Sequence, residues 1–151
     1  MQAEDILHFW FEELSSAQHF AQEDAIDAMI RVRFGPTWQA AARCELWGWR
    51  ATPQGRLAEI VVLDQFSRNI HRGTPQAFAQ DAQALVLAQE LVAGGHDVAL
   101  PPAQREALIL VAALELDIAE AASITGVPEG TVKARVSRAR AALARDFDTQ
   151  R

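Results

Sequence analysis

The stretch at residues 130–145 reads GTVKARVSRARAALAR and has the pattern of an amphipathic α-helix. Its apolar residues recur at intervals of four, three and four positions, which places them in one stripe along the helix. Between Thr131 and Arg145 the sequence has five basic residues and no acidic residue. The face opposite the stripe carries small residues and an arginine, so it can enter a groove of DNA. This stretch therefore predicts a DNA recognition helix.

Seven residues of this helix are candidates for contact with DNA. Thr131 and the first amides are expected to meet phosphate, because a helix N-terminus favours anions. Ala134, Ser137 and Arg138 are expected to face base edges, with Arg138 placed for bidentate contact with guanine. The other three cations are expected to position the helix on the phosphate backbone, although charged helix faces are often only solvated. In chain order the candidates are Thr131, Lys133, Ala134, Arg135, Ser137, Arg138 and Arg140.

The residues before this helix predict the rest of a helix-turn-helix unit. A helix is expected over 102–115 and a shorter one over 118–124. Gly126 supplies the positive φ that a tight turn needs. Ala122 is small where two helices cross, and Val132 is the first core residue of the third helix. This spacing of alanine, glycine and valine is typical of a helix-turn-helix.

The whole segment 100–143, LPPAQREALILVAALELDIAEAASITGVPEGTVKARVSRARAAL, resembles region four of bacterial sigma factors, particularly the extracytoplasmic-function class. The resemblance implies binding of double-stranded DNA at a promoter −35 element and contact with RNA polymerase. Where such families usually have a glycine before the second helix, this chain has Glu115, Leu116 and Asp117. The geometry of that first turn therefore stays open.

The N-terminal part of the chain predicts about five helices and no strand. Asp24 is expected to cap the second helix, and Gly35–Pro36 is expected to end it. Thr52–Pro53 and Thr74–Pro75 each predict a helix start, with threonine as the cap and proline at the first helical position. The expected helices are 3–14, 25–34, 37–49, 53–72 and 76–92.

Several motifs of this part resemble a family of uncharacterised bacterial proteins with an all-helical, tetratricopeptide-like fold. They are ILHFWF (6–11), RFGP (33–36), TPQGRLAEIVVLDQFSRNIHRGTPQAFAQDAQAL (52–85) and LPP (100–102). Members of that family continue with several more helices. Because the two resemblances meet at LPP, we interpret the chain as a fusion of natural or laboratory origin. It would join a truncated helical-repeat domain (1–99) to a helix-turn-helix unit (100–147) and a tail (148–151), with helix 102–115 completing the body.

The charge distribution allows a DNA-binding role in spite of a net charge of −6. Residues 1–99 hold 7 basic and 13 acidic residues, whereas residues 100–151 hold 7 of each, with the basic ones gathered on the last helix. An acidic body with one basic face is compatible with modest non-specific affinity for DNA. The single cysteine, Cys44, and the absence of a signal sequence or a membrane-length apolar run predict a cytoplasmic protein with no membrane partner.

No pattern in the sequence indicates an enzyme, a cofactor or a metal site. The histidines lack paired ligand spacing, Cys44 is expected to be a buried and inert thiol, and the four tryptophans are expected to lie in the core. A polar cluster near one helix end is interpreted as a structural network, with an anion pocket as the alternative. The residues of this cluster are Asp64, Arg68, Asn69 and Arg72.

The sequence as a whole predicts an all-α protein that binds promoter DNA as an accessory or regulator of transcription. The body does not resemble the part of a sigma factor that melts DNA, so a complete sigma factor is not expected. The alternative is a helical scaffold in which the C-terminal helices only complete the core and DNA binding is lost. A small-molecule or enzymatic role of the body stays open as a third interpretation. The oligomeric state and the preferred DNA sequence are not predicted.

Overall fold

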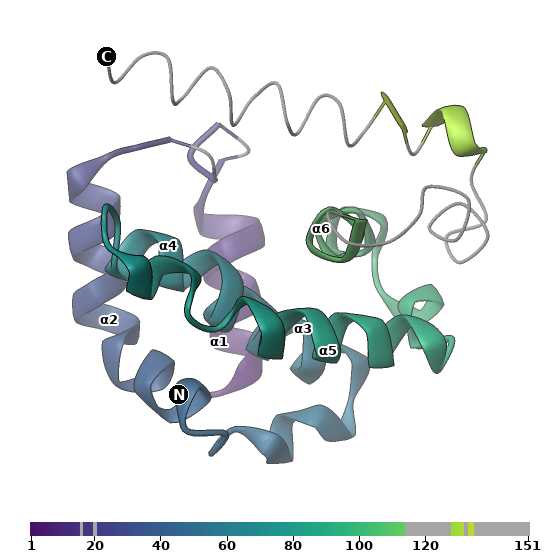
Figure 1. Cartoon of the computed structure of the whole chain (residues 1–151), viewed down its shortest axis with the longest axis horizontal. Coiled ribbons are helices and arrows are strands. Elements are labelled where there is room, and N and C mark those ends of the chain that lie inside the picture. The colour runs from purple at the N-terminus through teal and green to yellow at the C-terminus, as the bar shows by residue number, and fades with distance from the viewer. Residues whose placement is uncertain (16, 20, 114–127, 132, 135–151) are drawn as a thin grey trace.

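The computed structural model describes residues 1–15, 17–19, 21–113, 128–131 and 133–134 (Figure 1). Over these ranges the chain is helical and has no strand, so the predicted all-α class is confirmed. Two of the short elements, η1 and η3, are π-helical turns, and the other three are 3-10 turns. In chain order the elements are α1 (Ala3–His8), η1 (Phe9–Glu13), α2 (Asp24–Ala42), η2 (Trp47–Ala51), α3 (Pro53–Val61), η3 (Val62–Phe66), α4 (Ser67–Ile70), η4 (Pro75–Phe78), α5 (Asp81–Ala93), η5 (His96–Ala99) and α6 (Pro102–Ala113).

Most of the helix pairs that pack side by side are separated in the sequence by one other helix (Figure 1). α3 contacts both α1 and α5, α2 contacts α4, and α6 contacts α5. One hydrophobic cluster extends through this arrangement, from Ala3 in α1 to Leu108 in α6. The described helices are therefore joined by a common core.

Three phenylalanines at the centre of the core explain the two π-helical turns. Phe9 begins η1 and Phe66 ends η3, and both rings pack on Phe34 of α2 with centroid distances of 4.8 and 5.0 Å. All three side chains are fully buried. A π-helical turn has hydrogen bonds between residues i and i+5 and so contains one residue more than an α-helical turn. The extra residue changes which side chains of the following helix point toward the core. The turns thus bring aromatic rings from three helices to one point, where such rings contribute most to burial.

α2 is one helix through Gly35–Pro36, so the helix end predicted there is wrong. The stripe Ile30, Phe34, Thr37 and Ala41 crosses the proline without a break, and all four residues are buried. Proline also disfavours a helical residue before it by meeting that residue's Cβ, and Gly35 has none. Burial of a continuous apolar face thereby outweighs the loss of one backbone hydrogen bond at Pro36.

Both ends of α2 differ from the prediction. The N-cap residue is Glu23, and Asp24 is the first helical residue rather than the cap. The helix ends at Ala42 instead of continuing to Trp49, and a turn leads to the 3-10 element Trp47–Ala51. The turn contains Cys44 at φ 59°, in the left-handed region. A residue in that region ends a right-handed helix. The helical spacing of the apolar residues after Cys44 does not indicate this break.

The two Thr–Pro pairs behave differently. Thr52 caps α3 as predicted, because its Oγ1 accepts a hydrogen bond from the Gly55 amide at 3.0 Å and Pro53 is the first helical residue. Thr74 makes no such bond; its hydroxyl donates instead to the His71 carbonyl at 2.8 Å. Pro75 opens only the short turn η4, and α5 begins at Asp81. At the second pair, a helical element does begin at Pro75, but the predicted cap by Thr74 is absent.

The C-terminal side of the body continues from α5 into α6. α5 ends at Ala93, one residue after the predicted end at 92, and Gly95 follows at φ +69°. α6 packs against α5, and its Leu108 is fully buried in the common core. Thus the first helix of the predicted helix-turn-helix unit shares the core of the body. Its expected second helix, at 118–124, lies outside the described residues.

No helix in the described ranges has both the length and the apolar content that a bilayer span requires.

Candidate functional site

The described residues include three of the seven predicted DNA contacts. Lys133 and Ala134 are helical and exposed, and Thr131 is helical and half-buried. The other four candidates lie outside the described residues; they are Arg135, Ser137, Arg138 and Arg140. The structure thus shows the beginning of the predicted recognition helix. The predicted contacts with DNA bases stay predictions, and two of the three residues, Ser137 and Arg138, lie outside the described part.

The beginning of this helix has the local chemistry of a helix N-terminus. The Thr131 amide donates to the Pro128 carbonyl at 2.9 Å, and Glu129 and Gly130 are helical and exposed. The first amides of a helix have no partner within the helix and carry a partial positive charge. Lys133, one turn later, adds a full positive charge on the exposed surface. Both features favour a phosphate group as a ligand.

A second group of polar residues holds α2 to the end of α4. Asp27 is 6% exposed and accepts a hydrogen bond from the Asn69 side-chain amide at 2.8 Å. The Arg72 guanidinium pairs with the same carboxylate through two nitrogens. The positive charge of Arg72 is thus matched by a carboxylate within the fold. This part of the cluster is a structural network, as the sequence analysis favoured over an anion pocket.

Arg68 ties the same helix end to α5. Its guanidinium donates to both carboxylate oxygens of Asp81, at 2.6 and 3.1 Å, and lies 3.4 Å from the carboxylate of Asp64. It also lies over the ring of Phe78, 4.9 Å from the ring centroid. Burial raises the pKa of Asp64, and the positive charge of Arg68 opposes that rise. Because Arg68 is shared between two carboxylates, it neutralises each only in part.

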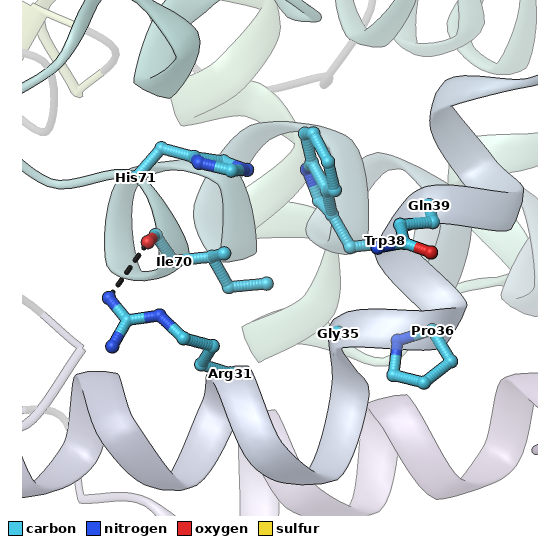
Figure 2. A pocket seen from close by; sticks show the side chains of 7 residues that line it. All are labelled: Arg31, Gly35, Pro36, Trp38, Gln39, Ile70 and His71. Atoms are coloured by element: carbon cyan, nitrogen blue, oxygen red, sulfur yellow. Dashed lines mark hydrogen bonds between the residues drawn. The ribbon is translucent and has the colours of Figure 1, made fainter.

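A pocket with a cavity volume of about 380 Å³ opens between α2 and the end of α4 (Figure 2). Arg31 is the charged residue among those that line it, and no lining residue is acidic. The Arg31 guanidinium donates to the Ile70 carbonyl at 2.9 Å, which joins the two walls. The lining residues are Arg31, Gly35, Pro36, Trp38, Gln39, Ile70 and His71.

Two rings lie side by side in the lining of the pocket (Figure 2). The indole of Trp38 and the imidazole of His71 have centroids 4.3 Å apart and planes inclined by 59°. The Trp38 Nε1–H donates to the Ser67 hydroxyl at 2.7 Å, which fixes the indole. The Nε2 atom of His71 is buried and makes no hydrogen bond with the described residues. Burial, and then the charge of Arg31, lower the pKa of His71, so the imidazole is neutral at pH 7.

The pocket could not be predicted from a helix that ends at Gly35–Pro36. In one continuous helix Arg31, Gly35 and Trp38 follow the spacing i, i+4 and i+7, which places them on one face. The second wall is formed by Ile70 and His71, which lie near the predicted helix end at residue 72. The missing signal was thus the continuity of α2 rather than the identity of a residue.

Two expectations about single residues are wrong. Cys44 is exposed rather than buried, because it lies in the turn that ends α2. Trp47 is 71% exposed, whereas Trp10 is buried and Trp38 and Trp49 pack partly buried against the core. The described ranges contain no group of three or more histidine, cysteine, aspartate or glutamate side chains arranged to hold a metal ion. Helical spacing alone did not separate core positions from those of a surface turn.

Comparison with known proteins gives two similarities of very different extent. A family model described as "Bacterial protein of unknown function (DUF924)" matches residues 6–134. The chain is also similar to the solved structure of a protein of unknown function from Agrobacterium tumefaciens, with 30% identity and a TM-score of 0.76. That similarity covers 99% of this chain and 84% of the other.

The second similarity is short. Over 45 residues the chain is 54% identical to a probable RNA polymerase sigma-C factor of Mycobacterium bovis and to the ECF RNA polymerase sigma factor SigC of Mycobacterium tuberculosis. These 45 residues are 30% of this chain and span about a quarter (24%) of each sigma factor. The family match, in contrast, covers most of the chain and includes α6. The chain therefore belongs to the bacterial family of proteins of unknown function DUF924.

Proposed function

We propose that the C-terminal part of the chain binds double-stranded promoter DNA in the manner of sigma-factor region four. The observation that carries this proposal is the 54% identity over 45 residues to two RNA polymerase sigma factors. The basic segment 130–145 supports it, because five cations without an acidic residue match a phosphate-lined groove. The proposed role is a binding protein of the cytoplasm that assists or regulates transcription, and not an enzyme.

The contacts follow the predicted roles of the third helix. Thr131 and the first amides meet phosphate, and Lys133 adds a backbone contact from an exposed position. Arg138, with Ala134 and Ser137, reads base edges of a −35 element. RNA polymerase is the second proposed partner. The similarity spans only a quarter of each sigma factor, so the proposal does not include initiation by this chain alone.

We propose further that the chain is a fusion of a body at 1–99 with a helix-turn-helix unit at 100–147. The resemblance of residues 100–143 to sigma-factor region four supports this division, and the 45-residue match to two sigma factors is about as long as that segment. The family match crosses this boundary and ends at residue 134. In this proposal α6 has two roles. It is the first helix of the DNA-binding unit and, through Leu108, a part of the core.

Fluorescence anisotropy with a labelled duplex that carries a −35-type element tests DNA binding. We expect affinity to fall steeply between about 50 and 200 mM salt, because phosphate contacts release counterions. Lys133→Ala should reduce the magnitude of the logarithmic salt slope by about 1 and weaken binding to all duplexes alike. Arg138→Ala should cost about 1–3 kcal/mol and reduce discrimination between duplexes.

Arg43→Ala is the matched control, because it removes one positive charge from an exposed residue of the body. It should leave both the affinity and the salt slope nearly unchanged. Absence of binding at about 50 mM salt would contradict the proposal. Equal effects of Lys133→Ala and Arg43→Ala would contradict the assigned contact face.

One observation favours a second candidate function, that of a helical scaffold without DNA binding. Leu108 of α6 is fully buried among the residues of the body, so this helix contributes to the core whether or not DNA is bound. The binding experiment separates the two functions. A folded, monodisperse protein that does not change the anisotropy of the duplex at low salt would support the scaffold function.

A further inference from the structure

The arginines of the body are almost all paired with carboxylates, and Arg31 is an exception. Of the described arginines, six form ion pairs with aspartate or glutamate, whereas Arg31 and Arg105 have none and donate to backbone carbonyls. Asp27, one helical turn before Arg31, is occupied by Arg72 and Asn69. Arg31 therefore presents a positive charge that no described carboxylate neutralises.

The surroundings of Arg31 make it an oriented donor rather than a freely moving side chain. One terminal nitrogen donates to the Ile70 carbonyl at 2.9 Å, and this bond holds the guanidinium against the backbone at the end of α4 (Figure 2). A guanidinium has five N–H donors in a planar fork, so others can serve a bidentate anion. A carboxylate fits this fork because its two oxygens match the spacing of the donors.

The rest of the pocket is shaped for a flat apolar group. The Trp38 indole is fixed by its bond to Ser67, and the ring of His71 and the side chains of Ile70 and Pro36 complete the lining (Figure 2). At Gly35 an added Cβ would meet no atom within 4 Å, so the helix surface leaves open space beside the rings. A cavity of about 380 Å³ lies at the lower end of the range for small-ligand sites.

His71 adds an observation that also favours a ligand. Its Nε2 atom is buried, has no hydrogen-bond partner among the described residues and belongs to a ring that lines the pocket. Buried polar atoms without a partner are few in folded proteins. Because the His71 imidazole is neutral, Arg31 is the charged residue of the lining. The pocket can therefore neutralise one anionic group of a ligand but not two.

From these features we propose that the pocket between α2 and α4 binds a small aromatic monocarboxylate. The carboxylate pairs with the Arg31 guanidinium, and the aromatic ring lies against Trp38 and His71. The site is separate from the proposed DNA-binding residues, and its occupation does not depend on that function. The bound ring excludes water from the lining side chains, and the ion pair fixes its orientation.

Nuclear magnetic resonance with benzoate as the probe tests the site in the full-length protein. The indole N–H signal of Trp38, identified by its loss in Trp38→Phe, should shift with benzoate and saturate with a dissociation constant of about 1 mM or lower. Benzamide has the same ring and no charge, and inorganic phosphate has charge and no ring. Each should bind at least about tenfold more weakly than benzoate, because it lacks one of the two interactions.

Two arginine variants complete the experiment. Arg31→Gln should weaken benzoate at least about tenfold and leave benzamide unchanged, whereas Arg43→Gln should alter neither. Benzamide or phosphate binding as tightly as benzoate to the unmodified protein would overturn the proposal without reference to any variant. Absence of a shift at about 10 mM benzoate would also overturn it.

Discussion

Single carboxylates decide how the helix ends of the body are held. Asp27 is the clearest case, because one buried side chain accepts hydrogen bonds from Asn69 and pairs with Arg72 across two helices. From the sequence, Asn69 and Arg72 were expected to cluster with Asp64, and Asp27 was not predicted. Asp27 is 42 residues from Asn69, and no local pattern reveals a partner at that separation.

Removal of the Asp27 carboxylate should lower the free energy of unfolding by about 2 kcal/mol. Asp27→Ala removes the carboxylate that Arg72 and Asn69 share, and the partial exposure of Arg72 limits the cost. Urea denaturation followed by circular dichroism measures the difference. Asp24→Ala, at an exposed position of the same helix, should cost only about 0.5 kcal/mol through the helix dipole. Equal costs for the two variants would contradict the structural role of Asp27.

His19 should make the stability depend on pH in the mildly acidic range. Burial lowers the pKa of His19, and a hydrogen bond with the Trp10 carbonyl opposes that change. The unfolded chain then binds more protons than the folded chain below pH about 6.5, so the free energy of unfolding falls as pH decreases. His19→Gln should flatten this dependence between the ordinary and the lowered pKa. His71, whose pKa is also lowered, should leave a residual slope in that variant.

Denaturation series between pH about 7.5 and 5 measure the slope for each variant. His96→Gln, at an exposed position, is the control and should retain the slope of the unmodified protein. An unchanged slope in His19→Gln would show that this histidine does not couple protonation to folding.

At the scale of elements, tertiary burial overrides local signals in α2 and agrees with them in α3. Thr52 and Pro53 start α3 as their chemistry predicts. Gly35 and Pro36 fail to end α2, because the buried stripe continues past them. The π-helical turn at Phe9 was not predicted either. Its extra residue interrupts the regular helical spacing of the apolar residues. Helix existence was therefore predictable, whereas continuity and caps depended on contacts far along the chain.

The two Thr–Pro pairs provide a matched test of capping. Thr52→Ala removes the hydrogen bond to the Gly55 amide and should lower the free energy of unfolding by about 1 kcal/mol. Thr74→Ala makes the same chemical change before another proline, where no cap bond exists. Its cost should be about 0.5 kcal/mol or less, because only an exposed bond to the His71 carbonyl is lost. A larger cost at Thr74 than at Thr52 would contradict the assignment.

At the scale of the whole molecule, the shared core links the proposed DNA-binding unit to the body. α6 belongs to the segment that resembles a sigma factor, yet its Leu108 is buried with residues of α1 to α5. The sequence predicted both the all-α class and the packing of this helix onto the body. The pocket at Arg31 could not be predicted, because it requires the continuity of α2 and the position of His71 relative to it.

Leu108→Ala should destabilise the entire body by about 2–5 kcal/mol, because a fully buried leucine leaves a cavity. All four tryptophans lie before residue 50, so tryptophan fluorescence reports unfolding of the body alone. The midpoint of denaturation measured by fluorescence should therefore decrease in this variant. Val98→Ala, at a position 67% exposed, should leave it nearly unchanged. A normal midpoint in Leu108→Ala would show that the C-terminal unit folds separately.

The turn that ends α2 gives the protein a unique chemical handle. The sequence contains one cysteine, and its thiol is exposed in that turn. The Gln83 amide nitrogen of α5 lies 3.3 Å from the Cys44 sulfur, so the thiol marks the place where two distant helices meet. A maleimide dye would thus label a single site without prior mutagenesis. Its emission would respond to changes at the contact between this turn and α5, in the same molecule whose tryptophans report on the body.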